Sequence, residues 1–263
     1  MARSLRHGHR AELSHNAHTL ANDTDPPMSR TAHDATASST ATAGQAAAVR
    51  VYVGGVRPLP ESGRLSGIYK QPVHGPLQLG AQGFEGDQQA DLRVHGGPDK
   101  AVHLYPARHY ARLAGQFPSA AELLQPGSIG ENLSTWQIDE SQVRIGDVWR
   151  LGQALLQPCQ PRNPCWKIDE RFGCSGMAAF IAEQHIAGWY LRVLRPGLVE
   201  PADELRLVEA SAAPSLQQAL QTWHAPRPDP GQLQELAAMP GIADNWRHKI
   251  LQRIDRLREQ EAG

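Results

Sequence analysis

Glycine and proline recur so often through the middle of this chain that no long helix can form there. Between residues 54 and 80 they stand every few positions, as Gly54, Gly55, Pro58, Pro60, Gly63, Gly67, Pro72, Gly75, Pro76 and Gly80. Proline fixes φ and removes a backbone donor, and glycine favours turns. Just upstream, Val49, Val51 and Val53 alternate with other residues at the period of a strand. The pattern predicts many short strands joined by turns, which is typical of a closed or partly closed β-barrel.

Other segments of the same region fit this mainly β fold. Residues 143–151 and 154–157 are predicted to form a hairpin about Gly152, and residues 205–208 a closing strand. Two segments have helical character, residues 107–117 after a proline and residues 178–186. We therefore expect a β-barrel domain over residues 49–209 with a few peripheral helices.

The pattern changes after residue 209. Leu216, Ala219, Leu220 and Trp223 follow the i, i+3, i+4, i+7 spacing of one helix face. Two more apolar stripes follow, and prolines separate the three. Residues 210–263 are therefore predicted to form a small all-α three-helix module.

The last of these helices has several basic residues. It carries Arg247, Lys249, Arg253, Arg256 and Arg258. These residues form either a docking face for an acidic partner or a solvated outer face, and a charge run by itself is more often the second.

The first 48 residues are rich in Ala, Thr, Ser, His and Asp and poor in large apolar residues. Such a segment cannot bury enough surface to offset its chain entropy, so it is predicted to be a disordered tail. Met28 is an alternative start of the protein.

Composition limits the partners of the chain. The formal net charge is −1 over 263 residues, which favours neither nucleic acid nor an anionic membrane as a partner. No run of about 18 apolar residues is present, so no membrane-spanning helix is expected. The three cysteines do not have the spacing of a disulfide framework. A reduced, cytoplasmic setting is expected.

One of these cysteines, Cys165, lies in an unusual loop. Pro161 and Pro164 stiffen the loop, and Arg162 and Lys167 place positive charge on both sides of the thiol. Nearby cations favour the thiolate, which is both a nucleophile and a metal ligand. The alternative is a small buried apolar cysteine, and the loop taken alone favours that alternative.

Three separated motifs change this balance. They are residues 83–88 followed by 94–102, residues 130–134, and residues 145–152 leading into the Cys165 loop. In this order and spacing they resemble the MOSC family, the domain type at the C-terminus of molybdenum cofactor sulfurases. The resemblance is greatest to the YiiM-like stand-alone bacterial subgroup, in which a three-helix module follows a MOSC-type β-barrel.

The resemblance implies that the molybdenum cofactor, Mo-molybdopterin, is bound with Cys165 as the metal ligand. A thiolate is a soft donor that suits a metal with a sulfur-rich shell. His95 is the second implied catalytic residue, since a histidine moves protons near neutral pH. Its alternative role is that of an ordinary loop histidine.

The remaining cofactor contacts are implied for Gly96, Gly97, Lys100, Glu131, Asn132 and Arg162. Glycines let the backbone approach a ligand closely, and Lys and Arg suit the phosphate and oxygens of the pterin. Glu131 and Asn132 offer donors and acceptors for the pterin edges, or else only form a turn. Glu85 and Asp87 either contact the site or order the His95 loop.

The activity that the resemblance implies is reduction of small N-hydroxylated compounds, such as hydroxylaminopurine-type base analogues, to amines, a detoxification. The chain has no flavin fingerprint and no iron–sulfur cysteine run, so a separate electron-donor protein, a flavin or iron–sulfur reductase, is expected. The alternatives are a persulfide carrier that uses Cys165 and a cofactor-binding module without turnover of its own.

Overall fold

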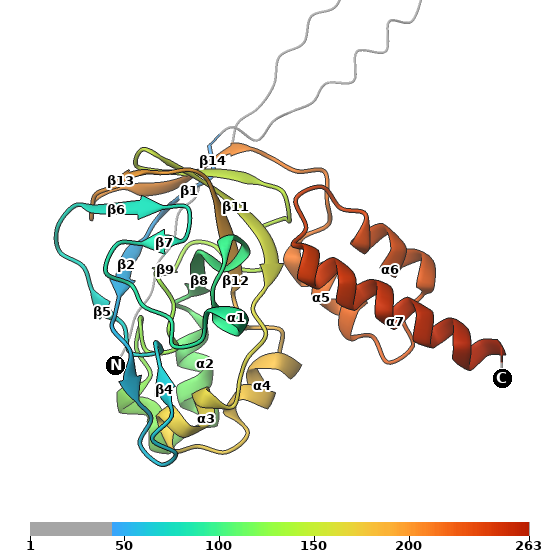
Figure 1. Cartoon of the computed structure of the whole chain (residues 1–263), viewed down its shortest axis with the longest axis horizontal. Coiled ribbons are helices and arrows are strands. Elements are labelled where there is room, and N and C mark those ends of the chain that lie inside the picture. Colours follow the sequence, from blue (N-terminus) through green and yellow to red (C-terminus); the bar gives the residue numbers. More distant parts are fainter. Residues whose placement is uncertain (1–43, 263) are drawn as a thin grey trace, which may run out of the picture. The chain divides into compact units, whose positions relative to one another are not determined.

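The computed structural model describes residues 44–262, with side chains up to residue 260. These residues form a sheet-rich fold with several helices, which confirms the mainly β prediction in outline (Figure 1). Most strands are short, as the glycine and proline pattern predicts.

The largest sheet has nine strands and is mixed. Its order is β1 (Ala46–Ala48), β14 (Glu204–Glu209), β10 (Val148–Leu151), β11 (Ala154–Pro161), β12 (Trp189–Arg195), β8 (Val102–Pro106), β9 (Leu133–Thr135), β2 (Arg50–Val53) and β5 (Gln71–Pro72). Only the β8–β9 pair is parallel among the described strands. Two small sheets accompany it: β13 (Gly197–Val199), β6 (Leu77–Gly80) and β7 (Gly83–Phe84) in one, and β3 (Arg57–Pro58) and β4 (Leu65–Ser66) in the other.

The predicted barrel is not confirmed. The nine-stranded sheet has edges at β1 and β5, and no ladder within residues 44–262 joins them. β1 and β2 are separated only by Val49, so one extended segment supplies strands near both ends of the sheet order. The fold is thus a mixed open sheet whose two ends approach each other through the chain and not through hydrogen bonds.

Several predicted elements are confirmed with shifted ends. The hairpin turns at Gly152, but β10 begins only at Val148 because Asp147 accepts the amides of Arg144 and Ser211 in a turn. The first predicted helix is α2 (His109–Gln116). It starts two residues later than predicted, because the amide of Ala107 donates to the carbonyl of Thr135 on β9.

The second predicted helix is α4 (Met177–Glu183). It ends early because His185 has a φ of 55°, which is incompatible with a continuing helix. Three short helical segments, α1 (Leu92–His95), α3 (Lys167–Phe172) and the 3₁₀ turn η1 (Pro98–Lys100), were not predicted, and neither was the 3₁₀ turn η2 (Pro118–Leu123). Segments of three to six residues are too short to show an apolar period.

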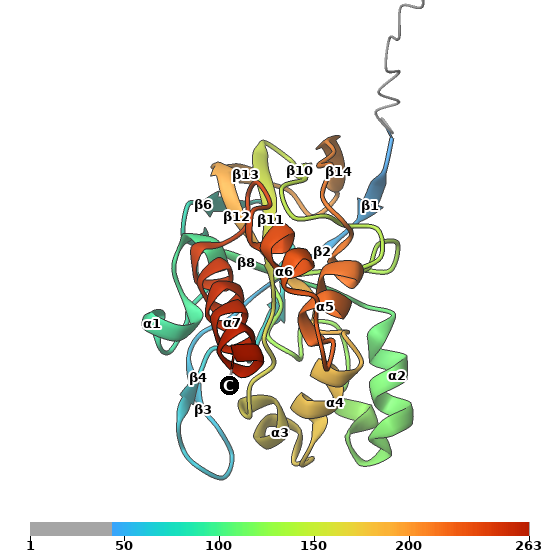
Figure 2. The ribbon, with the colours of Figure 1, turned by 90° about the vertical axis from the view of Figure 1, so that its right-hand side faces the viewer.

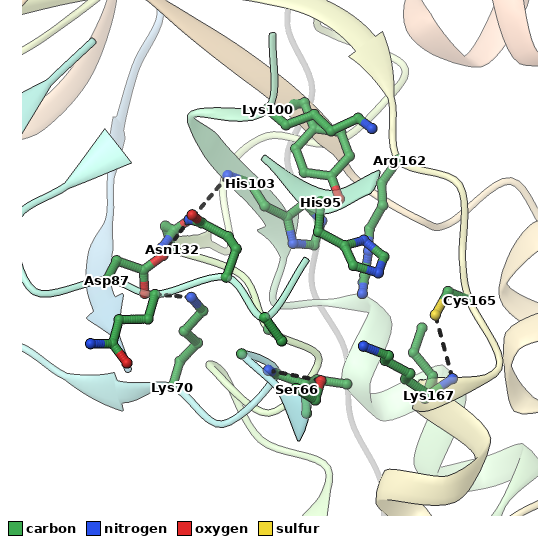
Figure 3. Close-up of a pocket in the computed structure, with 18 residues that line it drawn as sticks. Ser66, Lys70, Asp87, His95, Lys100, His103, Asn132, Arg162, Cys165 and Lys167 are labelled. Atoms are coloured by element: carbon green, nitrogen blue, oxygen red, sulfur yellow. Dashed lines mark hydrogen bonds and ion pairs between the residues drawn. The ribbon is translucent and has the colours of Figure 1, made fainter. Parts of the chain in front are cut away.

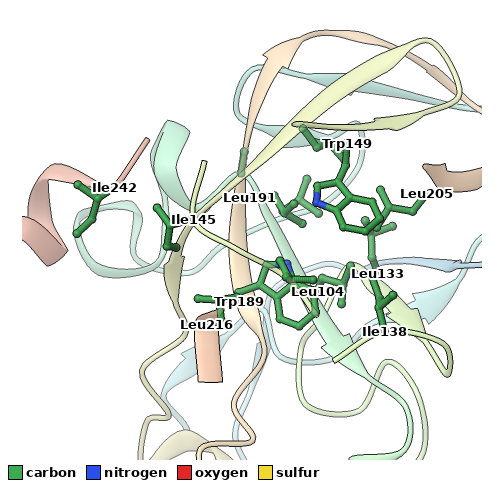
Figure 4. Packing of buried hydrophobic residues seen from close by; sticks show 14 of the residues in the cluster. Leu104, Leu133, Ile138, Ile145, Trp149, Trp189, Leu191, Leu205, Leu216 and Ile242 are labelled. Atoms are coloured by element: carbon green, nitrogen blue, oxygen red, sulfur yellow. The ribbon is translucent and has the colours of Figure 1, made fainter. Parts of the chain in front are cut away.

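The three C-terminal helices are confirmed as α5 (Leu216–His224), α6 (Pro230–Ala237) and α7 (Asp244–Ala262), seen together in Figure 2. Ser215 and Gln218 form a capping box at the start of α5, and Asp229 caps α6. Their apolar stripes do not form a separate core. Leu216 and Ile242 pack in the same buried cluster as Ile145 and the sheet residues Trp149 and Trp189 (Figure 4).

The basic residues of α7 have different roles. The Arg247 guanidinium donates to the carbonyl of Ala237 (3.1 Å), at the end of α6. Arg253 donates to the carbonyl of Ala225 (2.7 Å) and lies over the Trp223 ring, 5.1 Å from its centroid. Arg247 and Arg253 therefore fasten the helices to one another, a role that the charge pattern did not reveal.

The predicted tail ends too late. Ala46–Ala48 pair with Glu204–Arg206 as strand β1, and Ala47 is buried. Alanines have low β-propensity, so strand pairing and not local sequence explains this element. The rest of the predicted tail, residues 1–43, lies outside the described residues.

None of the helices in the described part of the chain is both long and apolar enough to cross a membrane.

We expect a chain that starts at residue 49 to be less stable than one that starts at residue 44. The shorter chain loses the β1 ladder and exposes the edge of β14. A loss of about 2 kcal/mol would lower the melting temperature by about 4–8 °C. Thermal unfolding of the two chains checks this, and equal melting temperatures would contradict it.

Candidate active site

A cavity of about 90 Å³ brings together residues of the first two sequence motifs and of the Cys165 loop (Figure 3). Its walls come from residues 66–70, 87–90, 95–103, 130–132 and 162–168, with Tyr190 of β12. Among the predicted site residues, those that line it are His95, Lys100, Asn132, Arg162 and Cys165.

Cys165 stands half-buried at the entrance of α3, where its carbonyl accepts the amide of Ile168. Its Sγ has one weak contact, from the amide of Lys167 at 3.5 Å. The ammonium of Lys167 donates to the carbonyl of Leu65 (3.0 Å) and also lines the cavity. The thiol is thus available to a ligand in a cationic surrounding.

The other two cysteines have different environments. Cys159 is fully buried, its Sγ donates to the carbonyl of Asp99 (3.2 Å), and burial raises its pKa to about 12. Cys174 contacts the hydroxyl of Ser119 (3.4 Å) outside the cavity. Among the cysteines, Cys165 is therefore the thiol that faces the cavity.

Arg162 is held firmly but has a donor left over. Its backbone amide donates to the carbonyl of Gly188 (3.1 Å), and its Nη2 donates to the carbonyl of Ile129 (3.0 Å). Its Nη1 is buried and has no hydrogen-bond partner within the described residues. A buried unpaired donor is costly, so this atom suits a ligand oxygen that would pair with it.

Gly188, which anchors Arg162, could not be another residue without strain. Its φ is 70°, and a Cβ there would lie 2.2 Å from the carbonyl oxygen of Leu104 and 3.2 Å from the His103 ring.

A buried ion pair between Lys70 and Asp87 forms the opposite wall. Their side chains are 4% and 1% exposed. Asp87 also accepts the amide of Gly54 (2.9 Å) and the Nδ2 of Asn132 (3.0 Å). Burial lowers the pKa of Lys70, and the charge of Asp87 opposes that shift. Asp87 thus lines the cavity and also connects three segments of its wall, those of Gly54, Lys70 and Asn132.

Asn132 is fully engaged in this network. Its Oδ1 accepts the amide of His103 (3.1 Å), and its Nδ2 donates to Asp87 and to the carbonyl of Tyr52 (3.2 Å). Its side chain lines the cavity but has little hydrogen-bonding capacity left for a ligand.

His95 and Lys100 lie on the cationic side. Burial and then the charges of Lys167, Lys100 and Arg162 lower the pKa of His95. The ring is therefore neutral at pH 7. The Lys100 ammonium donates to the carbonyl of Val94, in the same loop.

Three predicted residues do not reach the cavity. Glu131 turns into the core, where its Oε1 accepts from the Tyr110 hydroxyl (2.7 Å) and the Gly127 amide (2.6 Å). Burial raises the pKa of this carboxyl. Gly96 closes α1, and Gly97 turns the chain with a φ of 95°. Both glycines lie outside the lining, as does the exposed Glu85.

Sequence reasoning missed His103, Tyr190 and Lys70. His103 lies in the fully buried strand β8, and its Nε2 is 3.2 Å from the carbonyl of Ala187. Burial and then the charge of Arg162 lower its pKa well below the usual value. A histidine within the apolar run 102–106 was the available signal. No local signal marks Lys70 or Tyr190.

The lining carries more positive than negative charge. Lys70, Lys100, Arg162 and Lys167 face one carboxylate, Asp87. The arrangement therefore suits an anionic ligand that presents a soft, metal-bearing or electrophilic end to Cys165.

Comparisons with known proteins identify the family of the chain. Residues 91–206 match the family model described as the MOSC domain, and residues 214–257 match the YiiM-like, 3-alpha helix domain. The protein YiiM of Escherichia coli (strain K12) is 40% identical over 206 residues, which cover 78% of this chain and 91% of YiiM. A protein named "Reductase" from Gibberella moniliformis is 37% identical over 145 residues, 55% of this chain and 26% of its own length.

Solved structures are also similar. The crystal structure of YiiM from E. coli matches with a TM-score of 0.68 and 33% identity over 80% of this chain and 93% of that one. YiiM from Geobacillus stearothermophilus matches with a TM-score of 0.67 and 28% identity over 80% and 100% of the two chains.

We expect His103→Gln to weaken the pH dependence of stability. The folded protein keeps this ring neutral, while the unfolded chain protonates it below its ordinary pKa of about 6.5. The contribution of the ring to stability is therefore complete above that value and is lost as pH falls. Denaturant unfolding between pH 7.5 and 5 should show that wild type loses more stability than the variant. The exposed His248→Gln serves as control, and parallel curves for wild type and His103→Gln would contradict the assignment.

Proposed function

The chain belongs to the MOSC-domain family, in its YiiM-like group, and on that premise we propose that it is a molybdenum-cofactor-dependent oxidoreductase that reduces N-hydroxylated compounds to amines. The observation that carries the proposal is the thiol of Cys165 at a cationic cavity that also holds the unpaired buried Nη1 of Arg162. The fungal relative named a reductase supports a redox reaction.

The residues present fit the cofactor. Molybdopterin is anionic, and the lining supplies Lys100, Lys167 and the free donor of Arg162. Cys165 offers one soft thiolate, and the other metal ligands would come from the dithiolene of the cofactor and from solvent or substrate. When bound, the cofactor supplies the two-electron reduction of the N–O bond, which consumes two protons and releases water.

In this reaction the protein would position the cofactor and supply a proton to the substrate. Cys165 would hold the metal at the cavity, and Arg162 would fix the anionic part of the cofactor through Nη1. His95 would transfer a proton to the leaving oxygen. Because burial and the neighbouring cations lower its pKa, the ring would first take up this proton from solvent and then pass it on.

Electrons would come from a separate flavin or iron–sulfur reductase, and the exposed arginines of α7 support a docking site there. Arg247 and Arg253 fasten the helices, but Arg256 and Arg258 are exposed. Electron-transfer encounters are typically small, transient and steered by charge.

We expect Cys165→Ala to purify without molybdenum and to lose all reduction of 6-hydroxylaminopurine, with a stability loss of about 1–2 kcal/mol. The side chain is half-buried and has one weak contact, so its removal leaves the fold intact. Metal analysis, pterin fluorescence and turnover with a small reductant check this.

Cys174→Ala is the matched control and should keep metal and turnover. A Cys165→Ala protein that reduces the substrate as wild type does would contradict the metal-ligand role. A wild-type protein that carries sulfane sulfur on Cys165 and no molybdenum would instead favour a persulfide carrier.

Arg256→Glu combined with Arg258→Glu should raise the KM for the protein electron donor severalfold, because both charges are exposed and steer an acidic partner. Added salt should have the same effect on wild type. The rate with a small artificial reductant should not change, and Arg150→Glu, an exposed arginine on β10, is the matched control. An unchanged KM would show that the arginines only solvate the helix.

A further inference from the structure

A second cavity, of about 240 Å³, adjoins the Cys165 cavity. The two share His95, Lys100, Arg162 and Tyr190 in their linings. The far wall of the second cavity belongs to the C-terminal helices, from residues of α5 and α7 that include Trp223, Trp246 and Lys249. The three-helix module is therefore part of the cleft that leads to Cys165.

The second cavity is cationic. Lys100, Arg162 and Lys249 reach it from three separate segments, and no Asp or Glu stands among its lining residues in the described part of the chain. Burial and then the charge of Lys249 lower the pKa of Lys100, so the two ammonium groups lie close enough to repel each other. The Lys249 ammonium has no hydrogen bond or ion pair with any described residue. An anion between these groups would relieve the repulsion and would also lie beside Arg162, which lines the same cavity.

The wall that carries Lys249 is held in place. The rings of His185 and His224 stack at 4.9 Å between the end of α4 and the end of α5. The Arg253 guanidinium lies over the ring of Trp223, the residue before His224. Burial lowers the pKa of both histidines. The two rings are therefore not the source of the positive charge in the cavity. The charge comes from the two lysines and the arginine.

Size also connects the two cavities. A cavity that holds benzene measures about 150 Å³, and the Cys165 cavity measures about 90 Å³. A fused-ring ligand whose reactive end reaches Cys165 therefore extends beyond this cavity. The larger, cationic cavity is next to them.

We propose that the second cavity binds the phosphate monoester of a ligand whose other end lies at Cys165, and that Lys249 of the three-helix module, with Lys100 and Arg162, is the phosphate-binding group. A phosphate monoester carries about two negative charges at pH 7 and several acceptor oxygens, which matches the cations better than a single carboxylate does. The Cys165 end of this statement rests on the proposed function, whereas the phosphate site does not. The phosphate belongs either to the pterin cofactor or to an N-hydroxylated nucleotide substrate.

Titration calorimetry with inorganic phosphate, AMP and adenosine tests the site without turnover, on the full chain produced in a host that makes no molybdopterin, so that no cofactor phosphate already fills the site. We expect phosphate and AMP to bind and adenosine to bind far more weakly. Lys249→Gln should weaken AMP binding about tenfold or more, since a charge-assisted hydrogen bond is lost. Lys249→Arg should restore most of it. Arg256→Gln, on the same helix but outside the cavity lining, is the matched control for net charge.

Two further measurements on Lys249→Gln separate the sources of the phosphate. If the phosphate is that of the cofactor, the variant purifies with less pterin and molybdenum, and KM for substrates is unchanged. If it is that of the substrate, pterin content is unchanged, and the KM of the N-hydroxylated nucleotide rises relative to that of the free base. Either result supports the site.

Equal AMP affinity in wild type and Lys249→Gln, or equal affinity for AMP and adenosine, would overturn the proposal. If the phosphate site is confirmed and Cys165→Ala retains full activity, the proposed function fails and the phosphate site stands.

Discussion

The candidate site depends on one buried interaction, the ion pair between Lys70 and Asp87. Asp87 also accepts from Gly54 and Asn132, so one carboxylate joins the end of β2, the segment before β5 and the loop before β9. Asn132 in turn holds the amide of His103 in β8. Removing one partner of such a pair leaves an uncompensated buried charge and costs about 3–5 kcal/mol. The positions of the cavity-lining residues on these segments are therefore coupled to one another and to the stability of the sheet.

The sequence predicted which motifs meet but not how each side chain turns. His95, Lys100, Asn132, Arg162 and Cys165, from segments far apart in the chain, do line one cavity. Glu131 and Asn132 are adjacent, and a strand entry sends adjacent side chains to opposite faces, so only one of them could reach it. Lys70 pairs with Asp87, 17 positions away in the sequence. Tyr190 lies on β12, the strand that pairs with β8. Such contacts follow from register, which no local pattern reveals.

The same distinction applies to the fold. Apolar periods identified the helices of the C-terminal module and the strands β2, β10, β11 and β14, because each of these segments buries one face. Closure of a barrel and the packing partner of a helix depend on contacts between segments. No backbone hydrogen bonds join the two edge strands of the described sheet, so it is open. Residues of α5–α7 pack in the same buried cluster as residues of the sheet. The basic character of α7 was visible, but its division into fastening arginines, exposed arginines and one lysine in a cavity required the structure.

The distribution of charge connects the fold to the proposed ligand. The chain has a formal net charge of −1, yet Lys100, Arg162, Lys167 and Lys249 gather along two adjoining cavities. Without a ligand, the repulsion between Lys100 and Lys249 and the unpaired Arg162 Nη1 both oppose the folded arrangement. Any anion that binds there and not to the unfolded chain stabilises the fold in proportion to the logarithm of its concentration. The groups that would recognise the ligand are thus the same groups whose folding cost the ligand would offset, and three separate segments, one of them from the three-helix module, must be folded together to supply them.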